Sequence, residues 1–274
     1  MTDQRTLMAV HAHPDDEAIG TGGVLARYAA EGIRTVLVTC TNGELGDAPG
    51  SITPDKDEHD TSLVVATRLD ELRASCKTLG VTHLELLGYH DSGMMGWPQN
   101  DLPNAFWNAS VDDAAAKLTA LFEQYEPDVV VTYDENGFYG HPDHIQANRI
   151  TLAAARATGM PRKLYYTAVG KKRLGDMMRR MAEMLPEGSG MDFDPDDPPF
   201  GVDDETITTV VECSDYIEAK RASMAAHVSQ GDNIPFLRFS DEVFAQAFGR
   251  ESFVRVIDTT GAPVPEDDLF AGLR

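Results

Sequence analysis

The sequence is poor in cysteine, in basic residues and in long apolar runs. Its 274 residues include 3 cysteines, Cys40, Cys76 and Cys213, which are far apart and lie in predicted core segments. We therefore expect reduced, buried thiols rather than disulfides or a structural zinc knot. The chain has only 23 Lys and Arg residues against 45 Asp and Glu, which gives a formal net charge of −22. Because this charge repels nucleic acid and anionic membranes, we expect neither as a partner. No apolar stretch approaches the roughly 20 residues of a membrane span.

A signal-peptide pattern is also lacking. The chain starts MTDQR and becomes apolar at once, so we expect a cytoplasmic protein. A hydrophobic content of 42% over this length is enough for a large core. We expect one domain, residues 1–274, with an α/β core at 1–170 and a C-terminal extension at 171–274. The sequence is compatible with a homo-oligomer.

Strand and helix patterns alternate along the chain. Predicted strands cover residues 6–10, 35–39, 84–87 and 128–132, and predicted helices cover 22–31, 63–79 and 111–125. This alternation indicates an α/β fold, a Rossmann-like and mostly parallel sheet flanked by helices on both faces. The C-terminal part is less regular, with strands predicted at 206–213 and 253–257 and a helix at 215–226.

Residues 186–205 hold four prolines and eight acidic residues without any Lys or Arg. Because charge runs usually stay in water, we expect an exposed connection, with a mobile lid over a site as the functional alternative.

The chain does contain two clusters of residue types that commonly bind metal ions. The stretch 10–17, VHAHPDDE, contains two histidines and three carboxylates, and 141–144, HPDH, adds two more histidines and an aspartate. Each cluster comes after a predicted strand, and in parallel sheets ligands gather at the carboxyl ends of the strands. Imidazole mixed with carboxylate suits zinc, which in catalytic sites takes three protein ligands and keeps a position for water. We therefore predict a metal-dependent hydrolase.

Two other motif interpretations are weaker. The glycines of 20–23, GTGG, resemble a dinucleotide-binding loop, but five polar or charged residues separate them from the strand. We expect them to let a helix pack closely against the first strand. The pair His11 and His13 also resembles the first-strand histidines of barrel metallohydrolases, but that fold needs eight strand-helix units, which the sequence does not show.

Four polar residues are candidates for substrate binding. Asn42, Glu44 and Asp91 follow predicted strands and are typical partners of sugar hydroxyls. Arg68 lies on a predicted helix and could hold hydroxyls or a phosphate, although a helical Arg is more often in a surface ion pair.

With these motifs in place, the chain resembles the PIG-L/LmbE family of zinc-dependent N-acyl sugar deacetylases. The resemblance rests on residues 12–17 and 141–144, and extends to 41–44, 68–79, 87–93 and 132–137. Within the family, residues 163–166, 211–214, 225–227 with Gln230, and 268–272 are more similar to mycothiol S-conjugate amidases than to glucosaminyl-inositol deacetylases. The segment 94–98, MMGWP, departs from the amidase pattern.

The resemblance implies roles for individual residues. They are zinc ligands His13, Asp16 and His144, general base Asp15, substrate-facing His141 and Tyr139, and the possible substrate contact His227. On chemical grounds Asp15 can accept a proton from water, and an imidazolium at His141 beside Asp143 can donate to an oxyanion. Asp143 is expected to orient a histidine.

The predicted function is zinc-dependent hydrolysis of the amide of an N-acylated glucosamine, a small-molecule substrate of the mycothiol-conjugate or specialised-metabolite type. The first alternative is an N-acetylglucosaminyl-inositol deacetylase. A metal-stabilised binding protein without turnover is the alternative of another class, and it gains nothing from a free carboxylate at Asp15.

Overall fold

The computed structural model describes residues 4–184, 194–233 and 235–274. A seven-stranded sheet with the order β3-β2-β1-β4-β5-β7-β6 runs through them. The strands are β1 (Thr6–His11), β2 (Arg34–Thr41), β3 (His83–Tyr89), β4 (Val129–Thr132), β5 (Lys163–Ala168), β6 (Thr209–Glu212) and β7 (Arg250–Asp258). The first five strands are parallel, whereas β7 pairs antiparallel with both β5 and β6.

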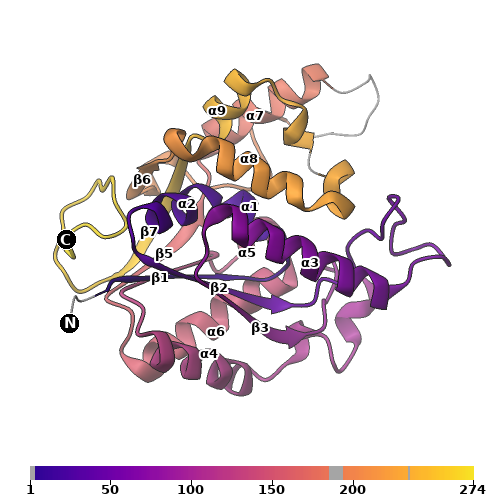
Figure 1. Cartoon of the computed structure of the whole chain (residues 1–274), viewed down its shortest axis with the longest axis horizontal. Helices are drawn as coiled ribbons and strands as arrows, with labels where there is room; N and C mark the ends of the chain where they lie inside the picture. Colours follow the sequence, from indigo (N-terminus) through magenta and orange to yellow (C-terminus); the bar gives the residue numbers. More distant parts are fainter. Residues whose placement is uncertain (1–3, 185–193, 234) are drawn as a thin grey trace.

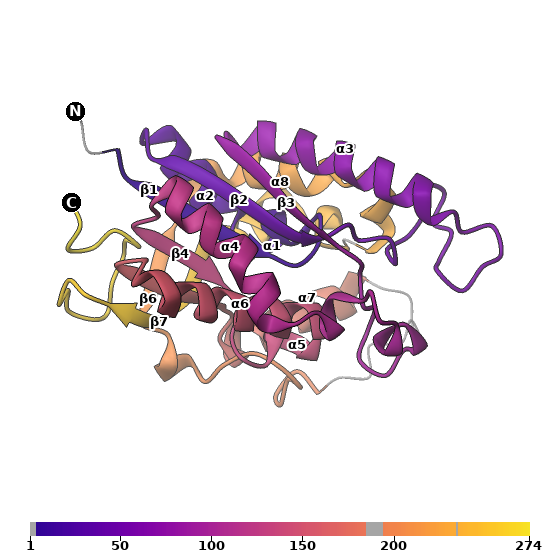
Figure 2. The same ribbon diagram turned by 90° about the horizontal axis from the view of Figure 1, so that it is seen from below.

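Helices cover both faces of the sheet (Figure 1). They are α1 (Asp16–Gly20), α2 (Gly22–Ala30), α3 (Thr61–Leu79), α4 (Val111–Tyr125), α5 (Gly137–Gly140), α6 (Pro142–Thr158), α7 (Lys171–Met184), α8 (Ile217–Ala226) and α9 (Asp241–Phe248). The described residues also form the 3-10 helices η1 (Pro98–Asp101), η2 (Phe106–Asn108), η3 (Asp204–Thr206), η4 (Ser214–Tyr216), η5 (Val228–Asn233) and η6 (Pro235–Arg238). Figure 2 shows α4 and α6 side by side on one face.

Strand β1 lies at the centre of the core and is wholly buried. Its residues alternate between two hydrophobic clusters, since Leu7 packs with α2 and α3 and the adjacent Met8 packs with α4 and α6. This pattern of a strand covered on both faces confirms the predicted α/β fold. The strand predicted at 253–257 is part of β7, but its antiparallel pairing was not predicted, and neither were β5 and α6.

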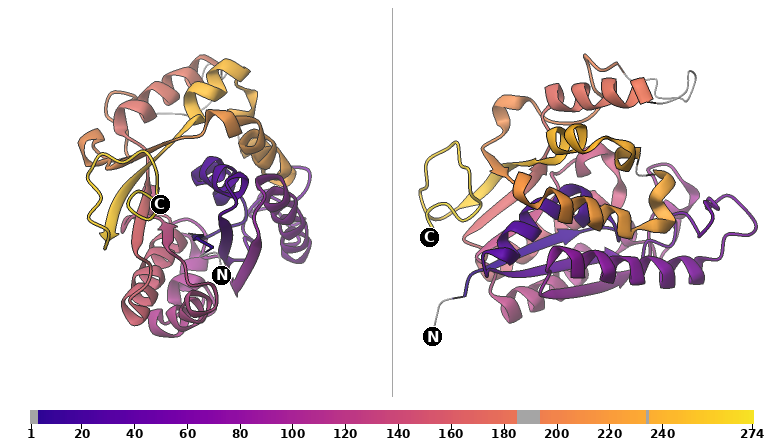
Figure 3. Two further views of the ribbon diagram at one scale, coloured as in Figure 1. Left: turned by 60° about the vertical axis from the view of Figure 1, so that its left-hand side comes forward. Right: turned by 45° about the horizontal axis from the view of Figure 1, so that its top comes forward.

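The C-terminal helices pack beside the first metal-ligand cluster. A third hydrophobic cluster joins Ala18 of α1 to Met181 of α7, Met224 of α8 and Phe244 of α9. Figure 3 shows these helices together over the α1 and α2 side of the sheet. Helix α1 is therefore supported by residues that come more than 150 positions later in the chain.

A Cβ at Gly20 would meet the His11 ring of β1 at 3.4 Å, whereas Gly23 has a different role from the predicted packing against the first strand. Backbone N–H groups of Gly23 and Val24, at the start of α2, donate to the Glu251 carboxylate at 2.7 and 2.8 Å, and Lys220 pairs with the same carboxylate. A Cβ at Gly23 would lie 2.7 Å from the Cβ of Cys213. The close packing at Gly23 is thus against the C-terminal segment, and a carboxylate of the protein satisfies the positive end of the helix.

Replacing Gly23 by alanine is expected to destabilise the fold. The new methyl group would overlap Cys213 and the Glu251 carboxylate, and overpacking of this kind costs about 1–3 kcal/mol. Denaturant unfolding measures the loss. Gly22→Ala is the matched control, because the nearest atom to a Cβ there is the Cγ of Lys220 at 3.2 Å, a milder contact than the one at Gly23. Equal stability of the two variants would contradict the packing role.

The remaining predictions on core and surface have mixed outcomes. All three cysteines are buried and unpaired, as predicted. Residues 186–193 of the acidic segment lie outside the described residues, and Phe200 of the same segment contacts Phe138 with ring centroids 5.2 Å apart. The strand predicted at 206–213 is shorter in the structure, because β6 covers only Thr209–Glu212. In the described ranges no helix is both long and apolar enough to span a membrane.

Candidate functional site

The two metal-ligand clusters meet at the carboxyl ends of β1 and β4, which are neighbouring parallel strands. The loop after β1 carries His13, and α6, which follows β4, begins beside His141 and carries His144. The ring of His13 lies 4.5 Å from that of His141 and 5.3 Å from that of His144, centroid to centroid. The sheet therefore brings residues far apart in the sequence into one site, as the strand positions predicted.

The predicted metal ligands converge. Ligand nitrogens of His13, His141 and His144 lie within 4.8 Å of one another. The Asp16 carboxylate lies 3.3 Å from Nδ1 of His13 and 3.5 Å from Nε2 of His144. A second overlapping group combines His13 and His141 with Asp91 and Asp143.

His144 supplies the test of whether these residues fit a metal. Its side chain is 3% exposed, and neither ring nitrogen has a hydrogen-bond partner among the residues described. Burial lowers the pKa of His144 to about 4, so the ring is neutral and offers a lone pair. A buried imidazole without a partner is costly, and a bound cation accounts for it. The donor set therefore fits a divalent metal ion.

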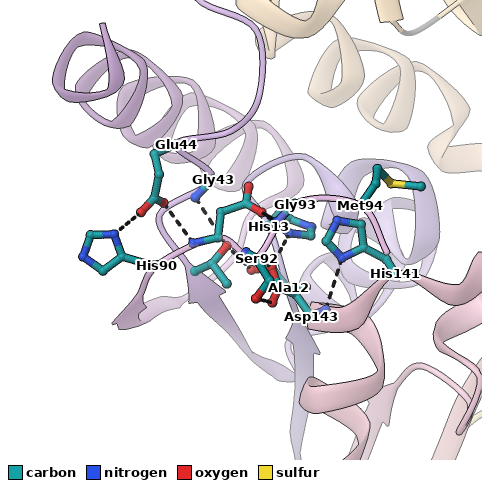
Figure 4. A network of polar contacts seen from close by, with 12 residues as sticks. Ala12, His13, Gly43, Glu44, His90, Ser92, Gly93, Met94, His141 and Asp143 are labelled. Carbon is teal, nitrogen blue, oxygen red and sulfur yellow. Dashed lines mark hydrogen bonds and ion pairs between the residues drawn. The ribbon is translucent and has the colours of Figure 1, made fainter. Parts of the chain in front are cut away.

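Asp143 orients His13 rather than His141 (Figure 4). Its carboxylate is 3.1 Å from Nε2 of His13 and accepts the Ser92 N–H at 2.9 Å, together with the Ser92 hydroxyl. This leaves Nδ1 of His13 facing Asp16. A ligand histidine whose other nitrogen donates to a carboxylate is a common arrangement around metals. Asp143 is fully buried, which suits this orienting role.

The structure contradicts the expected imidazolium at His141. Nδ1 of His141 accepts the Asp143 N–H at 3.1 Å, so the proton of the neutral ring lies on Nε2. Burial, with the nearby His13 and His144, lowers the pKa of His141 to about 2. The neutral ring can still donate from Nε2. A charged ring is disfavoured because the Asp143 carboxylate faces His13.

Tyr133 holds the Asp16 carboxylate in place. Its hydroxyl donates to Asp16 at 2.7 Å and accepts the Ala12 N–H at 2.9 Å. His11 lies 3.1 Å from the same hydroxyl through Nδ1 and 2.8 Å from the Thr21 hydroxyl through Nε2. His11 is thus part of the support of the site, since both of its ring nitrogens are used within the protein.

Asp15 precedes the candidate metal ligand Asp16, and its carboxylate pairs with Arg68 instead of capping its own helix. It is the N-cap residue of α1, yet it makes no capping hydrogen bond with its side chain. The carboxylate is 22% exposed and lies 3.1 Å from the Arg68 guanidinium. Burial raises the pKa of Asp15 to about 6, while Arg68 opposes the shift. A carboxylate with this pKa is ionised at neutral pH and is more basic than usual.

Arg68 and His227 are turned into the protein. Arg68 is 3% exposed, and its guanidinium also donates to the carbonyl oxygens of Gly43 and Pro14, both at 2.5 Å. His227 is fully buried and contacts Glu17 at 2.7 Å. Their predicted substrate contacts stay predictions, and the contacts within the protein indicate support of the site.

The other predicted substrate residues lie at the strand ends. Glu44 pairs with His90 at 2.5 Å and accepts the Asp91 N–H at 3.2 Å (Figure 4). Asp91 lies 3.6 Å from His13. Asn42 is half-buried beside Glu44 in the sequence. The Glu44 and Asp91 side chains form a polar flank next to His13.

Tyr139 is the exposed aromatic residue of the site. It is 43% exposed, and its ring lies 5.1 Å from that of His144 and 6.1 Å from that of His141. A tyrosine hydroxyl is protonated at neutral pH, so it can act as a hydrogen-bond donor. Tyr139 follows Phe138, whose φ of 65° lies in the left-handed region.

Three supporting residues were missed by the sequence reasoning: Tyr133, Ser92 and Glu17. All three lie inside or beside the recognised motifs. The available signal was the position of Tyr133 and Ser92 just after predicted strands, where side chains reach the carboxyl edge of the sheet.

Comparison with known proteins agrees with this site. Residues 8–155 match the PIG-L family model, described as GlcNAc-PI de-N-acetylase. A 1D-myo-inositol 2-acetamido-2-deoxy-alpha-D-glucopyranoside deacetylase of Acidothermus cellulolyticus is 42% identical, over 98% of this chain and 95% of the relative. A protein of the same name from Geodermatophilus obscurus is 41% identical, over 100% and 99%.

Solved structures share the fold at low identity. The N,N'-diacetylchitobiose deacetylase of Pyrococcus horikoshii superposes with a TM-score of 0.59 at 18% identity, over 93% of this chain and 84% of that one. The 4-carboxy-2-hydroxymuconate hydratase GalB of Pseudomonas putida gives 0.63 at 16% identity, over 95% and 99%. A hydratase and a deacetylase on one fold show that function must be argued from the site.

The full-length relatives decide the classification. They are deacetylases, which confirms the predicted class, a hydrolase of carbon–nitrogen bonds other than peptide bonds. The family model covers the segment that carries both metal-ligand clusters. This chain belongs to the PIG-L family.

Proposed function

We propose that this chain is a zinc-dependent deacetylase that hydrolyses the acetamide of N-acetylglucosamine linked to inositol. The observation that carries the chemistry is the convergence of unpartnered His144 with His13 and Asp16, beside a carboxylate, Asp15, that is left over as a base. The substrate follows from the relatives that match the chain over nearly its full length and bear this name.

In the proposed hydrolysis, each step is assigned to a particular side chain. A divalent cation held by His13, Asp16 and His144 would acidify a water molecule and polarise the amide carbonyl. Asp15 accepts a proton from the attacking water and returns it to the leaving amine nitrogen when the C–N bond breaks. His141, through its Nε2–H, donates to the oxyanion that develops on the carbonyl, and the Tyr139 hydroxyl is a second donor.

Two of the segments that resemble the amidase branch, 163–166 and 268–272, do not favour that substrate. Lys163 is buried and pairs with Glu266 at 2.5 Å, and Tyr165 donates to the same carboxylate at 2.9 Å. Asp268 accepts the Tyr28 hydroxyl at 2.8 Å. These residues attach the C-terminal segment to the rest of the fold instead of lining the site. Their likeness to the amidases therefore indicates a shared fold and not a shared substrate.

The direct test is turnover by the purified, zinc-loaded protein. We expect free amine from N-acetylglucosaminyl-inositol, detected by mass spectrometry, and little from an acyclic N-acetyl amine, because unpaired polar groups in a sugar site reject a substrate without hydroxyls. A mycothiol S-conjugate serves as the third substrate. Faster hydrolysis of the acyclic amine would overturn the sugar assignment.

The polar flank gives a second prediction. Glu44→Ala should raise KM about tenfold and change kcat little, because a hydroxyl contact is made in the ground state and in the transition state alike. His90→Ala, which removes the exposed partner of Glu44, is the control and should leave KM within about twofold. An unchanged KM in Glu44→Ala would remove this residue from the sugar site.

A further inference from the structure

The candidate base has a backbone conformation that needs support. Asp15 has φ 124° and ψ −27°, a region that residues with a side chain rarely adopt. Such conformations cost about 1–3 kcal/mol and persist only where the surroundings impose them. Arg68 holds the Asp15 carboxylate, so the remaining question is what holds its backbone.

Glu17 supplies that contact. One oxygen of its carboxylate, Oε2, accepts the Asp15 N–H at 3.0 Å. The other oxygen, Oε1, accepts the Ser75 hydroxyl at 2.5 Å and faces Nε2 of His227 at 2.7 Å. The Glu17 side chain is fully buried. Its carboxylate is therefore satisfied entirely by groups of the protein and is closed to substrate.

The partners of Glu17 come from distant parts of the chain. Ser75 lies on α3 and is bonded in turn to Ser223 of α8 at 2.6 Å. His227 is the C-cap residue of α8 and is fully buried. A single carboxylate thus joins the loop after β1 to a central helix and to the C-terminal extension.

We propose that Glu17 and His227 are a positioning pair for the reaction, which holds Asp15 in its strained conformation with the carboxylate free for proton transfer. The proposal rests on the proposed role of Asp15 as the base. Neither residue touches substrate. The C-terminal extension, through His227, completes a site whose chemical groups all lie before residue 145.

Glu17→Gln is the first test. An amide cannot replace both carboxylate oxygens, because its NH₂ group must face either the Asp15 N–H or the donors at Ser75 and His227. We expect kcat to fall up to about 10²-fold, the effect of a small misplacement of a reacting group, with KM and metal content unchanged. Glu266→Gln is the matched control, a buried carboxylate paired with Lys163 away from the site, and should keep kcat.

A double-mutant cycle distinguishes positioning from general stability. If Glu17 acts through Asp15, then Glu17→Gln should have no further effect on kcat in the Asp15→Asn background. Additive losses of kcat would overturn the proposal. His227→Gln keeps a donor toward Glu17 and should retain most of the activity that His227→Leu loses. Equal kcat in these two variants would also overturn it, even if Glu17→Gln does not fold.

Hydrogen exchange gives a readout that does not need turnover. Amide exchange of the peptide that contains Asp15, measured by mass spectrometry, should be faster in Glu17→Gln than in the wild type and unchanged in Glu266→Gln. If the wild type hydrolyses no acetylated amino sugar, the proposed function fails, and faster exchange still supports the contact from Glu17 to Asp15. Unchanged exchange in Glu17→Gln overturns the positioning pair whatever the substrate.

Discussion

Asp15→Asn should lower kcat by about 10²–10⁴ while the bound metal remains. Asparagine keeps the size of the side chain and can still accept from Arg68, but it cannot take a proton from water. The structure sharpens this expectation, because the Asp15 carboxylate makes no capping bond and is 22% exposed. Initial rates with N-acetylglucosaminyl-inositol and elemental analysis of the same sample measure the two quantities.

Asp128→Asn is the control for this substitution. The Asp128 carboxylate accepts the Thr6 N–H at 2.9 Å, at the amino ends of the strands and away from the site, so kcat should be unchanged. Near-normal turnover of Asp15→Asn would place the base elsewhere. Asp143 would be a poor replacement, because its carboxylate is fully buried against His13 and Ser92.

His144→Ala should lose most of the metal and nearly all activity, while the fold survives. The imidazole makes no hydrogen bond to the described residues, so its removal breaks none of their hydrogen bonds and takes away one ligand. Because ligand binding stabilises the native state, Zn²⁺ should raise the melting temperature of the wild type and have little effect on His144→Ala. Elemental analysis and thermal unfolding with and without Zn²⁺ test this.

His83→Ala controls for the loss of a histidine. His83 lies at the start of β3 and packs against Tyr125 with ring centroids 4.9 Å apart, away from the site, so the variant should keep its metal. Full zinc occupancy in His144→Ala would contradict the proposed ligand set, and the group of His13 with Asp91, His141 and Asp143 would then be the remaining candidate.

The strand-helix alternation was enough to predict the central fold and the meeting of the two clusters. Apolar strands such as 128–132 have a clear pattern, and the carboxyl ends of parallel strands lie on one edge by geometry. Strand β7 was predicted as an element, but its antiparallel place between β5 and β6 depends on pairing over more than 80 residues. No local pattern encodes such a pairing.

The supporting residues of the site could not be assigned in the same way. Arg68 was predicted as a substrate contact from its place on a helix and His227 from the family resemblance alone, and the structure shows that they contact Asp15 and Glu17 within the protein. Whether a polar side chain faces solvent or another side chain depends on tertiary packing. The His141 tautomer likewise follows from a single N–H of Asp143, which only the three-dimensional structure shows.

The position of β7 has a consequence for how the protein is made. During translation the parallel strands β1 to β5 leave the ribosome first, and β5 then has an open edge until residues 250–258 have been synthesised. An unpaired strand edge invites pairing with other chains. A nascent or truncated chain that stops before Arg250 would therefore contain every candidate catalytic group and still carry an aggregation-prone edge.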